Sequence, residues 1–264
     1  MLTEAKNQIK IMFLSIKYAL MREMLNKFSF AMNILFMILN NASFIIQWII
    51  FFSLKNSVGG YQFKQVLLLW GMASSTYGFS HFFFRKAYSL SDIINTGKLD
   101  SFLVQPKNVL ISVITTDVEP SAIGDILYGF IMLVLYKLTL KSFILFTLLS
   151  ICGALIATSF AVILNSLSFW FQKSDVISDT GTNLMLSFAT YPDGIFKGIV
   201  KIILYTIIPV GLANYIPVKI LINFNPWLTL LIILITILFI LLAFYVFFKG
   251  LKRYSSSNLM IARM

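Results

Sequence analysis

Apolar runs long enough to cross a lipid bilayer constrain this chain more than any other feature of its sequence. A spanning α-helix needs about 20 predominantly apolar residues. Because 59% of the residues are hydrophobic and only 12% are charged, a soluble core could not bury them. The sequence therefore predicts an all-α integral membrane protein with six transmembrane helices. They are expected over residues 28–54, 63–84, 120–138, 142–171, 176–190 and 226–248.

The first 27 residues have a different pattern. Apolar side chains recur at Ile9, Phe13 and Ile16, while Lys6 and Lys10 fall on another face. This spacing is typical of a helix that lies in the membrane interface on an anionic leaflet. We expect residues 1–27 to form an interfacial amphipathic helix and residues 28–264 to form the six-span transmembrane domain.

The positive charge of the chain indicates membrane topology. The net charge is +11, but the 21 Lys and Arg stand at the ends of apolar runs and form no aromatic-interleaved patch that would bind nucleic acid. With six spans, twice as many basic residues lie on the side of the two termini as on the opposite side. Basic loops stay in the cytoplasm. We therefore expect both termini to be cytoplasmic.

A charged interval at 85–106 separates the second and third apolar runs. Ser89 and Asp92 have the spacing of a capping box at a helix start, and Gly97 is suited to end that helix. Asp100 is expected to cap a second short helix. Such a helix is too short to span a bilayer, and the predicted topology places it in the cytoplasm.

The same short helix would present Leu90, Ile93 and Ile94 on one side. An apolar face on a capped, two-turn helix can dock into a groove on another protein. We therefore expect a cytoplasmic lever that contacts a partner through these residues.

The fifth apolar run contains a polar stripe. Asp179, Asn183 and Ser187 recur every four residues, so they share one helix face. Polar groups in hydrocarbon are costly, so this face should meet protein or water. It is a candidate lining of a translocation path, or it bonds helices together. Ser74 and Ser75 are further path candidates, with helix packing as their alternative role.

Two shorter apolar pieces, 195–208 and 210–222, precede the last run. Each is too short to cross a bilayer, and Pro209 and Pro217 interrupt them. We expect a re-entrant hairpin on the outer side of the membrane.

Several kinds of chemistry are excluded. The Gly97-Lys98 pair lacks the earlier glycine and the hydroxyl residue of a phosphate-binding loop, so ATP is not bound that way. His81 is the single histidine, which excludes a multi-histidine metal site. Gly78 to Phe82 begins like a nucleophile elbow but lacks its second glycine. We expect no catalytic residue and no metal site.

Three stretches together resemble the permease subunits of ABC-2 type ABC transporters, in particular the small bacterial permeases. Residues 94–106, INTGKLDSFLVQP, are similar to the family segment G-x-L-D-x-x-L-x-x-P between the second and third spans. Ile123-Gly124-Asp125 with Gly129 is similar to the head of the third span. Residues 191–196 with Ile208-Pro209-Val210 are similar to the outer turn and broken hairpin.

The resemblance implies a half-transporter in a bacterial plasma membrane that exports an amphiphilic substrate such as a drug, a lipid-like molecule or a peptide. Cytoplasmic ABC ATPase subunits would bind ATP and Mg, so this chain itself would hold no cofactor. A second permease, identical or paralogous, would complete the transporter. The interval at 85–106 would be the coupling helix, with coupling residues Ser89, Leu90, Asp92, Ile93, Ile94, Gly97, Leu99 and Asp100.

Two alternatives stay open. A secondary transporter would show internal repeats and ionisable residues near the membrane midplane. No repeat is apparent, and Asp125 and Asp179 lie toward the inner ends of their runs. A non-transporting assembly or immunity-type membrane protein would need no ATPase. Asp117, Glu119 and Asp125 are expected to favour the start of the third span, with an ion pair to Arg85 or Lys86 as the less favoured role.

Overall fold

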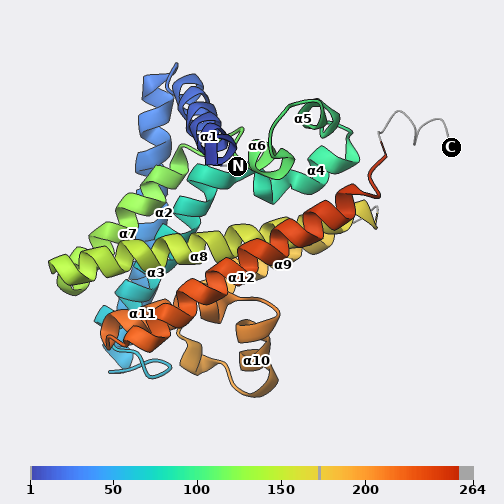
Figure 1. Ribbon diagram of the computed structural model, residues 1–264. Coiled ribbons are helices and arrows are strands. Elements are labelled where there is room, and N and C mark those ends of the chain that lie inside the picture. The colour runs from blue at the N-terminus through green and yellow to red at the C-terminus, as the bar shows by residue number, and fades with distance from the viewer. Residues whose placement is uncertain (1, 172–173, 256–264) are drawn as a thin grey trace.

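A computed structural model describes residues 2–171 and 174–255, and helices dominate this part of the chain (Figure 1). Met1, residues 172–173 in the turn before the fifth apolar run, and residues 256–264 of the expected transmembrane domain lie outside the described residues. The prediction of an all-α protein is confirmed for the described part.

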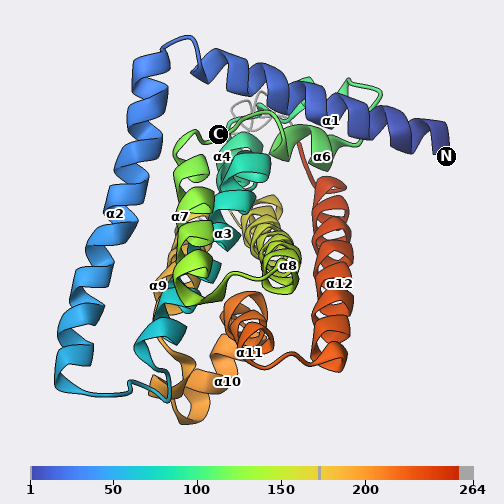
Figure 2. The same cartoon turned by 90° about the vertical axis from the view of Figure 1, so that its left-hand side faces the viewer.

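The first helix, α1 (Leu2–Glu23), lies across one end of the molecule, crosswise to the long helices α2 (Lys27–Leu54) and α12 (Pro226–Leu251) (Figure 2). Its Ile16 is buried against the bundle, but Ile9 and Phe13 are 54% and 56% exposed. One side of α1 therefore packs on the protein, while these two exposed apolar side chains are free to contact lipid. We call this end of the molecule the α1 end.

Three helices are long and apolar enough to cross a membrane: α2, α12, and α8 (Leu140–Ser166) with its continuation to Phe169. The pair formed by α10 (Gly198–Thr206) and the helical segment Gly211–Ile222 would be a fourth if it is one broken span. Six spans are therefore a prediction that the described helices support only in part.

The other three expected spans form helices at the predicted places. These are α3 (Phe63–Phe84), α7 (Ser121–Lys137) and α9 (Ser174–Ala189). With 17 and 16 residues, α7 and α9 are only about 25 Å long, shorter than a typical hydrocarbon core. The helix α3 is long enough, but its serine, glycine and histidine residues lower its hydropathy.

Small residues bring α3 and α7 into close contact. A Cβ atom at Gly71 would lie 2.7 Å from Met132 Cβ, and one at Gly129 would meet Ser75 Oγ. A Cβ at Gly78 would lie 2.9 Å from the Ala122 carbonyl oxygen. The two helix backbones can approach this closely only because these positions lack side chains.

The helix α8 occupies the middle of the molecule. A Cβ at Gly153 would lie 2.6 Å from the Ala213 carbonyl oxygen, and Ala157 and Ala161 on the same face are buried. These small residues form a packing face on α8. The helix α12 packs along α8, and its first turn is capped by Asn225 Oδ1, which accepts hydrogen bonds from the amides of Trp227 and Leu228.

The end opposite α1 is built from the two short apolar pieces (Figures 1 and 2). The helix α10 is followed by a π-helical turn, Gly211–Tyr215, and by α11 (Ile216–Ile222). The angle between α10 and the helical segment Gly211–Ile222 is 77°. The two apolar pieces thus form a bent helix pair, which is either one broken span or the predicted re-entrant hairpin. We call this end the α10 end.

The charged interval at 85–106 folds into short helices at the α1 end. A 3-10 turn over Arg85–Ser89 leads into α4 (Leu90–Asn95), followed by α5 (Asp100–Leu103) and α6 (Val109–Ile114). Gly97 has a φ of 73°, so the prediction of a left-handed residue that ends α4 is confirmed.

The prediction of a capping box at Ser89 is wrong. The Ser89 side chain makes no capping hydrogen bond, because the chain is already helical before α4 begins. Asp92 instead lies 3.2 Å from Lys98 Nζ as an ion pair. Asp100 does not cap α5 either, since Leu99 occupies the cap position, and Asp100 accepts a 2.8 Å hydrogen bond from the Tyr254 hydroxyl.

Candidate functional site

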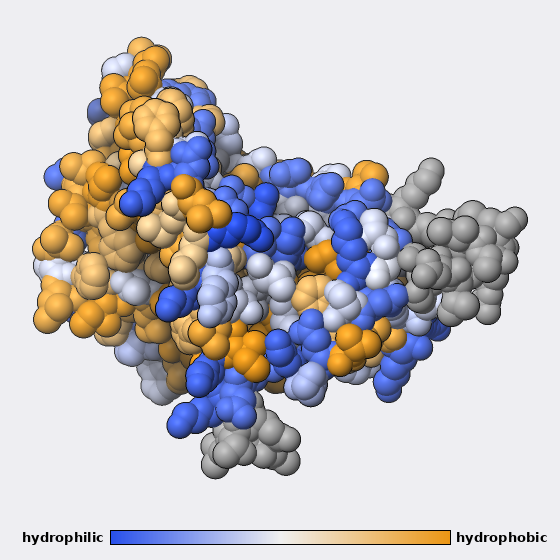
Figure 3. Space-filling model, turned by 90° about the horizontal axis from the view of Figure 1, so that it is seen from above, coloured by the Kyte–Doolittle hydropathy of each residue, from blue (hydrophilic) through white to orange (hydrophobic). Residues whose placement is uncertain are grey.

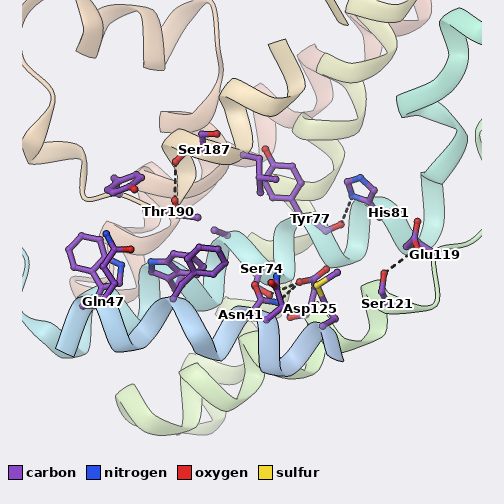
Figure 4. Close-up of a pocket in the computed structure, with 18 of the residues that line it drawn as sticks. Asn41, Gln47, Ser74, Tyr77, His81, Glu119, Ser121, Asp125, Ser187 and Thr190 are labelled. Atoms are coloured by element: carbon purple, nitrogen blue, oxygen red, sulfur yellow. Dashed lines mark hydrogen bonds between the residues drawn. The ribbon is translucent and has the colours of Figure 1, made fainter. Parts of the chain in front are cut away.

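A cavity of about 670 Å³ lies between α2, α3, α7 and α9 (Figure 4). Its walls combine aromatic, polar and charged side chains. The residues that line it are Met37, Asn40, Asn41, Phe44, Gln47, Trp48, Trp70, Ala73, Ser74, Tyr77, His81, Arg85, Glu119, Ser121, Asp125, Leu186, Ser187, Thr190 and Tyr191.

The cavity is elongated along α3. Within α3 its lining runs from Trp70 to His81, which corresponds to about 16 Å at the helical rise of 1.5 Å per residue, and it continues to Arg85 in the turn that follows. Arg85 and Glu119 stand toward the α1 end, and Trp48 and Tyr191 stand toward the other end. The cavity therefore extends along much of the thickness that a membrane would occupy.

A polar cluster of Asn41, Ser74 and Asp125 occupies the middle of the cavity wall (Figure 4). The Asp125 carboxylate accepts a 2.6 Å hydrogen bond from Asn41 Nδ2 and one of 3.2 Å from Ser74 Oγ. Gly124 makes this meeting possible, because a Cβ there would lie 2.5 Å from the Ile34 carbonyl oxygen of α2. The absent side chain lets α7 approach α2 and brings Asp125 to the amide of Asn41.

Aromatic side chains form the rest of the wall. The rings of Phe44 and Trp70 stack with their centroids 5.2 Å apart, and Trp48 packs edge-on against Tyr191 at 6.0 Å. Within the described part of the chain, Trp70 Nε1 and the Tyr77 hydroxyl are buried and have no hydrogen-bond partner. An apolar wall with a few unpaired polar atoms is typical of a small-molecule site.

Ion pairs surround the mouth at the α1 end. Arg85 Nε lies 2.9 Å from Glu119, and Lys86 Nζ lies 3.2 Å from Asp117. Asp117 also pairs with Arg22 of α1, and the hydrogen bond and the charge of this carboxylate raise the pKa of the Arg22 guanidinium. Asp117 and Glu119 thus form ion pairs just before α7 begins. The sequence analysis had given this role as the less favoured one.

Two of the five predicted path residues line the cavity, Ser74 and Ser187. Ser75 faces α7 instead, where it is fully buried beside Gly129. Asp179 and Asn183 are exposed and lie outside the cavity. They share the exposed face of α9 with Ser187, because the opposite face, with Ser178 and Met185, is packed into the bundle.

The apolar face of the expected lever is turned inward. Leu90, Ile93, Ile94 and Leu99 are between 0% and 7% exposed, and they pack with the α6 and α12 side chains of the chain's own core. The hypothesis that these residues dock on a partner is therefore wrong in its choice of face. The exposed side of the segment presents Asp92, Lys98 and Val104, of which Val104 is 84% exposed.

The surface around this segment is polar. Seen from the α1 end, hydrophilic side chains gather on the side where α4 and α5 lie, and hydrophobic side chains gather on the side of α2 (Figure 3). The polar side suits contact with water or a soluble protein, whereas the apolar side suits contact with lipid.

The described residues contain no group of three or more His, Cys, Asp or Glu side chains that could hold a metal ion. His81 is engaged with its own helix and a neighbour: Nδ1 lies 3.0 Å from the Tyr77 carbonyl oxygen, and the ring stacks on Tyr88 at 4.1 Å.

Sequence reasoning missed most of the cavity. It gave Asn41 no role and treated Asp125 as an acid at a helix start. The available signal was that each is a polar residue within an apolar stretch, which is costly unless it has a partner or a function. That they meet each other and Ser74 depends on helix packing between segments far apart in the chain.

Long apolar helices and a polar and aromatic cavity between them define a multi-pass membrane protein with an internal cavity. Residues 36–258 match the family model described as ABC-2 family transporter protein, which covers most of the chain. The chain belongs to the ABC-2 transporter family. Comparisons with curated proteins and with solved structures found no significant match. Permeases of this family are membrane components that work with separate ABC ATPase subunits, so membership suggests the permease role.

Proposed function

We propose that this chain is the permease subunit of an ATP-driven ABC exporter that moves an amphiphilic substrate across a bacterial plasma membrane. The observation that carries the proposal is the elongated cavity of about 670 Å³ between α2, α3, α7 and α9 in a member of a transporter family. An amphiphile suits this cavity because the wall offers both aromatic surface and polar groups. A drug, a lipid-like molecule or a peptide has that dual character.

In this proposal α2, α3, α7, α8, α9 and α12 are the six spans, and α10 with α11 is the re-entrant hairpin. The α1 end is cytoplasmic, with α1 in the inner interface and both termini on that side. The exposed Ile9 and Phe13 of α1 and the basic residues at this end support the orientation. The short α7 and α9 cross the membrane only if the bilayer thins beside them or if protein covers their ends.

The segment at 85–106 is proposed to contact the ATPase through its exposed side. Asp92, Lys98 and Val104 would meet the partner, while Leu90, Ile93, Ile94 and Leu99 would hold the segment to the bundle. Ser89, Gly97 and Asp100 would then act by shaping the segment. Because the segment is packed rigidly on the core, a push from the ATPase would reach α8 and α12 as a rigid-body movement.

A second permease, identical or paralogous, is proposed to cover the exposed face of α9. Asp179 and Asn183 would be in contact with lipid if the chain stood alone in the membrane, which is costly. A partner that faced them would form a shared, polar path between the two subunits.

The experiment is a mild-detergent purification of the tagged full-length chain from its native membrane, with identification of the stoichiometric partners and an ATPase assay. We expect an ATP-binding subunit to copurify and to hydrolyse ATP. The Val104→Asp variant should no longer copurify with that subunit. The elution volume of the variant chain by itself should equal that of the wild-type chain by itself. Asn56→Asp, at an exposed position in the loop between α2 and α3 at the α10 end, is the matched control.

The proposal of an ATP-driven exporter would be contradicted if the chain were purified without an ATPase from membranes that contain intact ATPase subunits. A secondary transporter would then be favoured, because Asp125 is an ionisable residue within an expected span, as ion-coupled transport requires.

A further inference from the structure

We propose that the cavity selects a cationic amphiphile, whose positively charged head is held by Asp125 and whose apolar body lies against the aromatic wall. The inference rests on the proposed transport function and adds the charge of the substrate to it. It is carried by the pairing of charges around the cavity, by two unpaired polar atoms in its wall, and by the shape of the site.

The charges that line the cavity are unequally paired. Arg85 is paired with Glu119 at 2.9 Å, so these two side chains neutralise each other at the mouth. Asp125 accepts hydrogen bonds only from the neutral groups of Asn41 and Ser74, and it has no ion-pair partner among the described residues. The middle of the cavity thus holds an acidic side chain without a counter-charge, which a bound cation would supply.

A carboxylate without a counter-charge is costly in a site shielded from water, and the cost falls when a cation binds. The protein itself leaves this position open, because the nearby basic residues Arg85 and Lys86 are held at the mouth by Glu119 and Asp117. An anionic amphiphile would instead meet Asp125 with like charge. The charge distribution therefore selects for cations.

The aromatic wall lies next to this charge. Phe44 and Trp70 form a stacked pair, and Tyr77 follows Trp70 two turns along α3. Aromatic faces attract cations as well as apolar groups. In addition, Trp70 Nε1 and the Tyr77 hydroxyl are buried without a partner in the described structure, so a ligand with an ether, carbonyl or hydroxyl oxygen would satisfy a donor that is otherwise unpaired.

The volume and length of the cavity suit such a molecule. About 670 Å³ is in the range of sites for drug-sized ligands, roughly 300 to 1,000 Å³. The extent of about 16 Å along α3, between Trp70 and His81, leaves room for an extended apolar body beside Asp125.

The test compares two probes of the same shape and opposite charge, tetraphenylphosphonium and tetraphenylborate. Saturable binding of each to the purified full-length chain in neutral detergent is measured by equilibrium dialysis, with protein-free micelles subtracted. We expect the wild-type chain to bind the phosphonium at one site with at least about tenfold preference, which corresponds to about 1.4 kcal/mol. Asp125→Asn should lose that preference.

Two further variants keep the test decisive if Asp125→Asn does not fold. Ser187→Trp places bulk in the cavity from the exposed face of α9 and should weaken phosphonium binding. Asp175→Asn, an exposed acid on the same helix, should leave both probes unaffected. Each variant is first compared with the wild type by size-exclusion chromatography.

Equal binding of the two probes by the wild type, or full phosphonium binding by a folded Asp125→Asn chain, would overturn the inference. Binding that Ser187→Trp does not weaken would place the probe outside this cavity and would also overturn it. None of these results would affect copurification of the ATPase, so the charge selectivity can fail while the permease function stands.

Discussion

At the residue scale, Asp193 joins three segments at the α10 end. Its carboxylate is 3% exposed and accepts hydrogen bonds from the Tyr61 hydroxyl, the Tyr205 hydroxyl and Lys219 Nζ at 2.9, 2.8 and 2.6 Å. Burial by itself would raise the pKa of Asp193, but the hydrogen bonds and the charge of Lys219 outweigh it and hold the pKa below its usual value. The loop before α3, α10 and α11 are thereby tied together.

We predict that Asp193→Asn lowers the free energy of unfolding by about 2 to 3 kcal/mol at neutral pH, since it removes a charged acceptor from three donors. The half-exposed Lys219 keeps the effect below that of a fully buried pair. The measurement is thermal unfolding in detergent, with Asp175→Asn as the exposed control.

The pH dependence of this effect has a definite sign. A carboxylate whose folded-state pKa is lowered contributes stability that is complete above its unfolded pKa, near 4, and is lost as the pH falls through the lower folded value. The wild type should therefore lose its advantage over Asp193→Asn only below about pH 4. An advantage that already disappeared between pH 7 and pH 5 would contradict the ion pair.

At the scale of the elements, the contact between α3 and α7 depends on glycine. We predict that Gly129→Ala costs about 1 to 3 kcal/mol, because the new Cβ would lie 2.6 Å from the Gly71 carbonyl oxygen and would strike Ser75 Oγ. Thermal unfolding and the yield of monodisperse protein measure the loss. Gly181→Ala in α9 is the control, since its Cβ would meet only the flexible end of Leu164. Equal stability of the two variants would contradict a tight α3–α7 contact.

A second prediction at this scale concerns how the short helix α4 is anchored to the core. Replacing Ile93 and Ile94 together by Asp should destabilise the whole protein, because both side chains are buried against the core. Asp92→Arg, on the exposed side, should leave the fold intact and change only the interaction with a partner. Size-exclusion profiles separate the two. A well-folded double variant at Ile93 and Ile94 would show that α4 is not anchored through its apolar face.

At the scale of the whole molecule, the proposed topology places the two ends of the structure on opposite sides of the membrane. In a background of Cys152→Ser, single cysteines at Lys98 and Lys219 should differ in their reaction with a membrane-impermeant maleimide in intact cells. Cys at 219 should react, and cysteine at 98 should react only after lysis. Both native lysines are exposed or partly exposed, so access by itself does not limit the labelling. Reaction of both from one side would exclude the six-span arrangement.

Much of the helical layout followed from local sequence. The bounds of α3 agree with the second apolar run, and α12 begins at Pro226 after its Asn225 cap, since both depend on residues next to one another. Gly97 adopted a left-handed conformation for the same reason. Prediction failed at Ser89 because a 3-10 turn precedes α4, and failed for Ile93 and Ile94 because an apolar face does not specify which partner covers it.

The sequence by itself determined that the chain enters a membrane and roughly where its long helices lie, because these properties depend on hydropathy and on neighbouring residues. Only the tertiary structure decided that Asn41, Ser74 and Asp125 meet in one cavity, that Arg85 pairs with Glu119, and that α4 turns its apolar face inward. These features depend on the relative positions of helices that are distant in the chain, and no local pattern encodes those positions.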